Sequence, residues 1–227
     1  MSNNKPIRRV AIIGTGVIGA SWAALFLAKG LEVIATDIAP DAETSLSRFV
    51  KAAWPALERL GLEPGASQSH LTFTHDMSAA VKSADFVQEN GPERIDFKQK
   101  LYRELDKLLS ADVIIASSSS GLTMSEIQSA CQLHPERCVI GHPFNPPHLV
   151  PLVEIVGGAK TSEATIERAA EFYAGLGKQP VRLRKEVPGH VANRLQAALG
   201  RERLWKNEIP VDGVGKAQRG CGPKRKT

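Results

Sequence analysis

Residues 10–37 read VAIIGTGVIGASWAALFLAKGLEVIATD, in which an apolar run, three glycines, a second apolar stretch and a final acid follow one another. The Val- and Ile-rich runs at both ends predict buried strands, and the apolar stretch between them predicts a helix. In the pattern Gly-x-Gly-x-x-Gly, Gly14 allows a tight turn, Gly16 lets the backbone approach a pyrophosphate, and Gly19 lets the helix pack closely. This order of elements predicts a dinucleotide-binding βαβ unit.

The amino end of the expected helix presents free amides and a positive dipole to the phosphates. The turn residues expected to contact the cofactor are Gly14, Thr15, Gly16, Val17, Ile18 and Gly19. Asp37 stands where a carboxylate binds the adenosine ribose hydroxyls, and residues 38–40 supply no arginine for a 2′-phosphate. NAD is therefore the expected cofactor rather than NADP. The alternative, a glycine turn that only packs a helix on a sheet, leaves Asp37 unexplained.

The chain of 227 residues is 42% hydrophobic, which suits one large or two smaller globular units, and its formal charge is +5. The charge is local: residues 200–227 contain eight Lys or Arg against three acids, so residues 1–199 sum to zero. A neutral body with a basic tail lacks the broad positive surface that nucleic-acid binding needs. We therefore expect a small-molecule substrate and no nucleic-acid partner.

The cysteines Cys131, Cys138 and Cys221 form no CxxC pair and have no histidine at zinc-site spacing. We expect reduced thiols, no bound metal and a cytoplasmic location. The first residues contain no signal-peptide core, and no apolar run approaches the roughly 20 residues of a membrane span. No membrane partner is expected.

Apolar runs that alternate with helical patterns predict a doubly wound α/β sheet of the Rossmann type, mostly parallel and covered on both faces. Strands are expected at 8–13, 31–36, 71–74, 85–89, 112–117, 138–142, 152–156 and 180–184. Helices are expected at 17–29, 42–60, 77–83, 94–109, 124–130, 162–175 and 191–205. Thr123 and Glu126 fit a capping box, and residues 61–69 are expected to form a loop.

Residues 1–186 are expected to form the NAD-binding domain. Residues 187–227 are expected to form the first helix of a C-terminal helical domain and a basic, disordered tail. From Pro210 onward, glycines and charges oppose a packed helix. This abrupt change in composition suggests a truncated or frameshifted reading frame, and hence an all-helical domain of which only the start is present.

An NAD-dependent reaction needs a group that takes the hydroxyl proton while hydride moves, and histidine suits this task near neutral pH. His142 is the candidate because it ends an expected strand, where open α/β sheets place ligands. His70, His75 and His134 fall in polar segments typical of the surface. His148 could pair with His142 on a metal ion, but no third ligand is apparent.

Glu154 lies within the apolar strand PLVEIV, where an unpaired carboxylate is costly to bury. As the hydrogen-bond partner of His142, it would fix the imidazole tautomer and raise the basicity of the ring. The alternative, equally open from the pattern, is an exposed glutamate on an edge strand. Residues 117–121 form a hydroxyl-rich turn that either bonds a substrate oxygen or is simply a tight βα loop.

Six ordered motifs make residues 7–205 resemble the 3-hydroxyacyl-CoA dehydrogenase superfamily. They are GTGVIG (14–19), QENGPER (88–94), SSSSGL (117–122), GHPFNP (141–146), PLVEIV (151–156) and VPGHVANRL (187–195). The resemblance implies roles near the substrate for five residues. These are His142 as base, Glu154 as its orienting carboxylate, Ser120 as donor to the substrate oxygen, Asn193 as an active-site amide and Asn145 as a supporting polar residue.

The same resemblance implies that Glu93 and Lys98 lie beside the nicotinamide ribose. Residues 53–58 (AWPALE), residues 61–67 (GLEPGAS) and the HPFNP loop are most similar to the L-carnitine dehydrogenase members. This similarity implies oxidation of L-carnitine to 3-dehydrocarnitine, with Phe144 as a candidate cation–π partner of the trimethylammonium group. The alternatives are a 3-hydroxyacyl-CoA or gulonate 3-dehydrogenase, or an NAD-binding protein without turnover.

Two features depart from the family pattern. Members usually carry a phenylalanine after Pro-Gly, where this chain has His190. The family also continues into a helical domain that forms most of a homodimer interface, and only its first helix is recognisable here. If this domain is missing, we expect NAD binding to persist and turnover and dimerisation to fail.

Overall fold

The computed structural model describes the backbone of residues 5–206 and the side chains of residues 5–201. The chain divides into two compact units, of which the first ends at Val191 and the second begins at Ala192. In the second unit, the described element is helix α7 (Ala192–Lys206). The predicted disordered tail and Cys221 lie outside the described residues.

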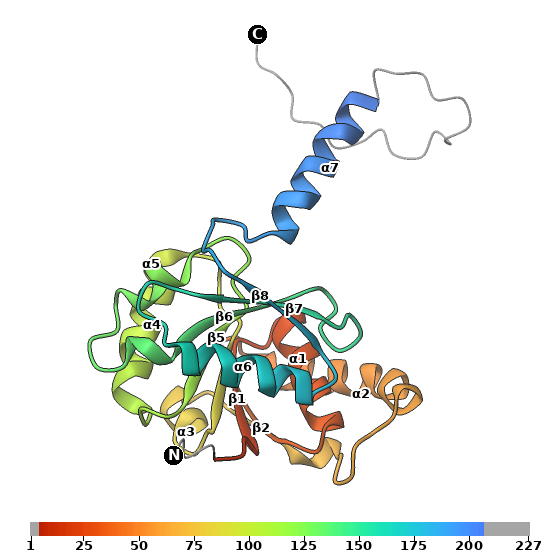
Figure 1. Cartoon of the computed structure of the whole chain (residues 1–227). Coiled ribbons are helices and arrows are strands. Elements are labelled where there is room, and N and C mark those ends of the chain that lie inside the picture. The colour runs from red at the N-terminus through yellow and green to blue at the C-terminus, as the bar shows by residue number, and fades with distance from the viewer. Residues whose placement is uncertain (1–4, 207–227) are drawn as a thin grey trace. The chain divides into compact units, whose positions relative to one another are not determined.

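The first unit is built on one eight-stranded sheet in the order β3-β2-β1-β4-β5-β6-β7-β8 (Figure 1). The strands are β1 (Arg9–Ile13), β2 (Glu32–Thr36), β3 (Leu71–Thr74), β4 (Phe86–Glu89), β5 (Ile114–Ser117), β6 (Cys138–Pro143), β7 (Leu152–Gly157) and β8 (Gln179–Leu183). All neighbouring strands are parallel except β6 and β7, which are antiparallel. The predicted doubly wound, mostly parallel sheet is confirmed.

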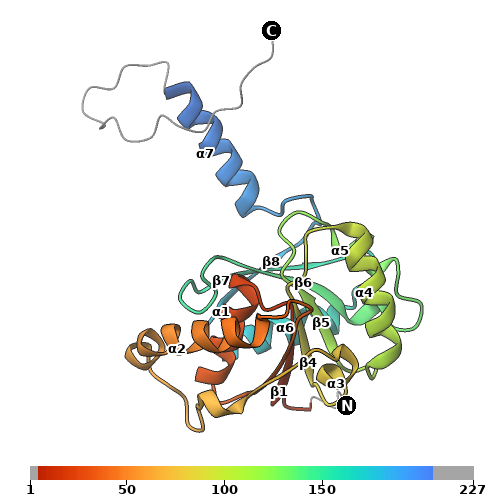
Figure 2. The same cartoon turned by 180° about the vertical axis from the view of Figure 1, so that it is seen from behind.

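Helices cover both faces of this sheet (Figures 1 and 2). Helices α1 (Val17–Ala28), α2 (Ala42–Leu60) and α6 (Glu163–Gly175) share one apolar cluster with the sheet. Helices α3 (Met77–Val81), α4 (Ile95–Leu108) and α5 (Met124–Gln128) share the cluster on the other face. Two short 3₁₀ turns, η1 (Gln68–His70) and η2 (Pro135–Arg137), precede β3 and β6. Among these described helices, none is both long and apolar enough to cross a membrane.

The core explains why the central strands are almost free of polar residues. Val10, Ala11 and Ile12 on β1 are completely buried because helices lie above and below them. On one face, Trp22 stacks on Phe26 at 5.4 Å, and Tyr173 of α6 lies against Trp22 at the same distance. These aromatic contacts fix α1 and α6 against the strands whose ends carry the site.

Most predicted elements differ from the observed ones by one or two residues at their ends. The helix predicted at 42–60 is α2, and the capping box of Thr123 and Glu126 is present at the start of α5. Helices α3 and α5 each end two residues earlier than predicted, and η1 occupies the end of the predicted loop at 61–69. The direction of β7 is the main feature that the sequence patterns left unstated.

Candidate active site

The candidate site lies at the carboxyl ends of the parallel strands. The strand order reverses between β1 and β4, and open α/β sheets bind ligands outside the strand ends at such a reversal. The segments that follow these ends are the glycine turn after β1, Asp37 after β2, residues 90–94 after β4 and the serine loop, residues 117–122, at the end of β5. His142 lies near the end of β6, at the same edge.

The three glycines of the turn stand in different surroundings. Gly14 has φ +83, and a Cβ there would lie 2.8 Å from the carbonyl oxygen of Asn90. A Cβ on Gly19 would lie 1.9 Å from the carbonyl oxygen of Gly14, so only glycine lets α1 approach the turn. A Cβ on Gly16 would meet no atom within 4 Å. The open space at Gly16 fits the expected approach of a pyrophosphate.

The amino end of α1 also fits a bound anion. Its N-cap is Gly16, which has no side chain to cap the first amides, and its first turn holds no acidic residue. The first amides of a helix lack partners within the helix and favour a negative charge. The residues present therefore fit the phosphates of a dinucleotide, which these amides would hold.

Asp37 is held firmly at the end of β2. Its Oδ2 accepts hydrogen bonds from the amide and hydroxyl of Thr15 at 2.6 and 3.1 Å, and its Oδ1 accepts one from the amide of Ala39 at 3.0 Å. Burial raises the pKa of Asp37, but the hydrogen bonds from Thr15 and Ala39 outweigh it and keep the pKa below its ordinary value. Asp37 is thus ionised and has lone pairs left for ribose hydroxyls.

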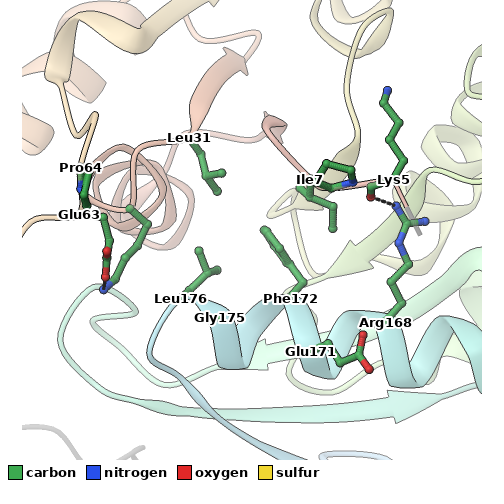
Figure 3. A pocket seen from close by; sticks show the side chains of 12 residues that line it. Lys5, Ile7, Leu31, Glu63, Pro64, Arg168, Glu171, Phe172, Gly175 and Leu176 are labelled. Carbon is green, nitrogen blue, oxygen red and sulfur yellow. Dashed lines mark hydrogen bonds and ion pairs between the residues drawn. The ribbon is translucent and has the colours of Figure 1, made fainter. Parts of the chain in front are cut away.

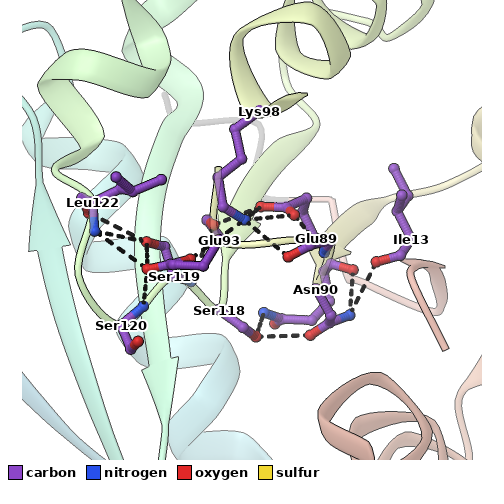
Figure 4. Close-up of polar contacts among 12 residues, drawn as sticks. Ile13, Glu89, Asn90, Glu93, Lys98, Ser118, Ser119, Ser120 and Leu122 are labelled. Carbon is purple, nitrogen blue, oxygen red and sulfur yellow. Dashed lines mark hydrogen bonds and ion pairs between the residues drawn. The ribbon is translucent and has the colours of Figure 1, made fainter. Parts of the chain in front are cut away.

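A buried ion pair lies beneath the centre of the site (Figure 4). The ammonium of Lys98, 1% exposed, lies 2.8 Å from both carboxylate oxygens of Glu89, which is fully buried. Ser117 donates a further hydrogen bond to Glu89 at 2.6 Å. Glu93 lies 3.9 Å from the same ammonium. Lys98 thus contacts the predicted Glu93, but its main partner is Glu89, to which the sequence patterns assigned no role.

Glu93 organises the serine loop. Its Oε1 accepts hydrogen bonds from the Ser119 hydroxyl at 2.7 Å and from the amides of Ser120, Gly121 and Leu122 at 3.0, 2.7 and 3.3 Å (Figure 4). Burial raises the pKa of Glu93, but these donors and the charge of Lys98 outweigh it, so the pKa is lowered. The ionised carboxylate thereby fixes the backbone that carries the predicted donor Ser120.

Asn90 and Ser118 connect the glycine turn to the serine loop. The Asn90 amide donates to the carbonyls of Ile13 and Gln88 at 3.4 and 3.0 Å, and its oxygen accepts from the Ser118 hydroxyl at 2.7 Å. Trp22 of α1 donates to the same hydroxyl oxygen at 3.2 Å. The two halves of the site therefore share one hydrogen-bonded framework.

His142 and Glu154 face each other across β6 and β7. They are paired in register, and directly opposite residues of an antiparallel pair have their side chains on the same face. Nδ1 of His142 lies 2.8 Å from Oε2 of Glu154. Glu154 is 3% exposed, and β7 lies between β6 and β8, which excludes the alternative of an exposed edge-strand glutamate.

This contact determines which nitrogen of His142 can act as a base. A carboxylate only accepts, so Nδ1 carries the hydrogen and Nε2 holds the lone pair. Burial lowers the pKa of His142, the hydrogen bond with Glu154 raises it, and His190 lowers it; the net effect is a lowered pKa. The ring is therefore a neutral acceptor near neutral pH.

Two other predicted residues lie in the segment that follows His142. The ring of Phe144 lies 5.3 Å from that of His142, and Asn145 follows it at an exposed position. Asn193 belongs to α7 in the second unit, so its role in the site stays a prediction.

The other histidine of this loop, His148, contacts the Ser21 hydroxyl through Nδ1 at 2.7 Å. Within the part of the chain that the structure describes, no group of three or more His, Cys, Asp or Glu is arranged to hold a metal ion.

A separate groove of about 520 Å³ lies at the opposite edge of the sheet (Figure 3). Its lining includes Ile7 and Leu31, which precede β1 and β2. Phe172 of α6 and Leu176, which directly follows α6, also belong to the apolar part of the lining. Its position at the amino ends of the strands separates it from the glycine turn and His142. The groove therefore takes no part in the candidate site.

The fold, the glycine turn and the ionised Asp37 define the first unit as an NAD-binding domain of the dehydrogenase class. Residues 9–187 match the family described as 3-hydroxyacyl-CoA dehydrogenase, NAD binding domain. The chain belongs to this family.

Similar proteins include L-carnitine dehydrogenases. That of Streptomyces griseus is 54% identical over 87% of this chain and 59% of its own length, and that of Pseudomonas putida is 52% identical over 92% and 64%. The chain thus spans about three fifths of these relatives. Among solved structures, an NAD⁺-dependent 5-formyl-3-hydroxy-2-methylpyridine 4-carboxylic acid 5-dehydrogenase matches with a TM-score of 0.83 at 39% identity, covering 89% of this chain and 66% of that one. The 3-hydroxybutyryl-CoA dehydrogenase of Escherichia coli matches with a TM-score of 0.82 at 28% identity, covering 89% and 43%.

Proposed function

We propose that the protein is an NAD-dependent dehydrogenase that oxidises the 3-hydroxyl group of a small hydroxy acid, with L-carnitine as its substrate. The observation that carries this proposal is the hydrogen bond between His142 and Glu154 at the sheet edge that bears the glycine turn. The relatives named L-carnitine dehydrogenase, at 52–54% identity, support the choice of substrate.

In the proposed reaction, Nε2 of His142 takes the proton of the 3-hydroxyl group. Glu154 holds the ring in the required tautomer and stabilises the imidazolium that forms. By the family resemblance, Ser120 and Asn193 would bond the substrate, with Asn145 in support, and Glu93 and Lys98 would bind near the nicotinamide ribose. NAD, when bound by the glycine turn and Asp37, supplies the hydride acceptor, and the product is a 3-oxo compound.

The surroundings of His142 favour a cationic substrate. Phe144 presents an aromatic ring beside the proposed base, and a quaternary ammonium group binds well over such a ring. Glu93 and Glu154 add negative charge to the same region. We expect Phe144→Leu to raise KM for L-carnitine and to leave NADH affinity unchanged.

A second candidate is oxidation of a 3-hydroxyacyl-CoA. The family assignment and the structural similarity to 3-hydroxybutyryl-CoA dehydrogenase favour it. The Asn-Pro-Pro sequence of residues 145–147 is the feature that keeps gulonate as a further alternative.

NADH formation with L-carnitine, gulonate and 3-hydroxybutyryl-CoA, each offered separately, tests the proposal. We expect turnover with L-carnitine and its loss in His142→Asn. Activity with 3-hydroxybutyryl-CoA alone would end the carnitine assignment. NADH binding, followed by fluorescence, without turnover on any of the three would identify an NAD-binding protein that does not catalyse this reaction.

We also propose a cytoplasmic location and, from the family resemblance alone, a homodimer whose interface the C-terminal helical domain would largely form. The Sγ atoms of Cys131 and Cys138 lie 3.8 Å apart as free, buried thiols, which is in keeping with a reducing compartment. Light scattering after size exclusion tests the dimer, and a single species of monomer mass would contradict it.

A further inference from the structure

His190 is a second imidazole in the candidate site, and the reaction proposed above gives it no role. It is fully buried, and its ring centre lies 5.3 Å from that of His142 at an interplanar angle of 47°. It lies on the turn formed by residues 187–191 and has φ 49, in the left-handed region that few side chains adopt. The backbone thus holds a bulky ring in a strained position directly against the proposed base.

The hydrogen bond of His190 shows which tautomer it adopts. Nε2 lies 3.0 Å from the carbonyl oxygen of Ser119, and a carbonyl only accepts, so Nε2 carries a hydrogen. Nδ1 is buried and has no hydrogen-bond partner among the described residues. A second proton on Nδ1 would therefore place an unpaired charge beside His142.

The turn around His190 also contacts both functional parts of the site. The amide of Gly189 donates to the carbonyl of Gly121 at 3.3 Å, and the amide of Val191 donates to Oε1 of Glu154 at 3.1 Å. Together with the bond to Ser119, these contacts hold the turn between the serine loop and the carboxylate that orients His142. The position of His190 is therefore fixed by three independent bonds.

We propose that His190 is a positioning residue that controls the charge of His142: the two buried rings, with centres 5.3 Å apart, accommodate one positive charge at most, which holds His142 neutral until it takes the substrate proton. This inference deepens the proposed function and rests on His142 as the base. The physical reason is that two like charges at this separation repel strongly in a buried site.

The carboxylates near His142 act in the opposite direction. Glu154 of β7 and Glu93 of the segment after β4 both favour the imidazolium. The cation Lys98 lies 3.9 Å from Glu93 and partly offsets its charge. The pKa of His142 is nevertheless lowered, by burial first and by His190 among the remaining causes. His190 thereby offsets the two carboxylates and keeps His142 available to accept a proton.

The test is an NMR titration of the histidine rings in the full chain, which needs neither cofactor nor substrate. In His190→Gln, the His142 ring should titrate at a higher pH than in the wild type. We expect a shift of about one pH unit or more.

Two further variants separate charge from structure. Gln at position 190 can still donate to the Ser119 carbonyl and Phe cannot, so a charge effect predicts the same His142 shift in His190→Gln and His190→Phe. His134→Gln is the matched control, because His134 is half-exposed, precedes the opposite end of β6 and pairs with Glu136. It should leave the titration of His142 unchanged.

An unchanged titration of His142 in His190→Gln and in His190→Phe would overturn the inference. Either variant alone gives this answer where the other fails to fold. The result is also separate from the proposed function, since absence of L-carnitine oxidation leaves the coupling of the rings unaffected.

Discussion

The two sides of the candidate site are built in different ways. On the cofactor side, Gly14, Gly19 and Asp37 lie within one βαβ unit. Their proposed role in binding NAD depends on backbone geometry and on two neighbouring strands. On the substrate side, the Ser119 carbonyl, His142, Glu154 and His190 come from four segments and depend on side-chain hydrogen bonds. A short stretch of sequence can specify the first side, whereas the second exists only after the sheet has formed.

The largest expected effect separates the two sides by their kinetics. We expect His142→Asn to lower kcat by about 10²–10⁴-fold, because it removes the general base, and to leave NADH affinity unchanged. Asp37→Ala should instead weaken NADH binding by about 10–100-fold, because hydrogen bonds to a charged group are lost, with kcat at saturating NAD nearly unchanged. Steady-state kinetics and fluorescence titration measure the two quantities.

A fall of both quantities in both variants would contradict this division of labour. It would mean that the two sides operate as one unit, coupled through Asn90 and Ser118.

The second prediction concerns the buried pair that supports the substrate side. Lys98→Met leaves Glu89 buried without its cation, and breaking such a pair costs about 3–5 kcal/mol of unfolding free energy. Chemical denaturation measures it. The matched control is Arg94→Met, since Arg94 pairs with Asp96 on the surface, with side chains 70% and 66% exposed. Equal unfolding free energies of the two variants would show that the buried pair of Lys98 and Glu89 stabilises the fold no more than the surface pair of Arg94 and Asp96.

The third prediction tests the cofactor side with two glycines three positions apart. Gly19→Ala should lower the unfolding free energy by about 3 kcal/mol, because the new methyl group overlaps the backbone of Gly14. Gly16→Ala should leave stability unchanged, because nothing lies within 4 Å of the new atom, but it should weaken NADH binding. Normal NADH affinity in a folded Gly16→Ala protein would argue against a pyrophosphate at this position.

This contrast also explains what the sequence could and could not predict. The βαβ unit consists of continuous apolar runs around a glycine turn, and α2 follows a pattern of period 3.6. Both were predicted to within a few residues. The antiparallel direction of β7 was missed, although residues 144–151 are too few for the crossover of a dozen or more that parallel strands require. That direction is what places Glu154 opposite His142.

The partner of Lys98 was missed for a similar reason. Glu89 ends the apolar strand β4, where a buried carboxylate needs a partner for the same reason as Glu154 does in β7. The contact of His190 with Ser119 spans 71 positions and follows no periodic pattern. Such long-range contacts depend on the packing of the whole sheet, which a single sequence does not display.

The smallest expected effect comes from Lys178, which joins the two sides. Its ammonium donates to the carbonyls of Pro147 and Val150 in the connection after His142, and it lies 5.4 Å from the ring of Trp22 in α1. Burial lowers the pKa of Lys178 to about 8. Since the unfolded chain keeps the ordinary pKa of about 10.4, it binds more protons than the folded chain between these values. The unfolding free energy of the wild type should therefore rise with pH over this range.

Lys178→Met removes this titration and nothing else that ionises. Between pH 7 and pH 10, we expect the unfolding free energy of the wild type to rise by about 2 kcal/mol relative to that of the variant. Urea denaturation at a series of pH values measures the difference, in which the titration of tyrosines and cysteines common to both proteins cancels. Parallel pH profiles would mean that Lys178 titrates as it does in water, and that the connection after His142 is not held to α1 by a buried cation.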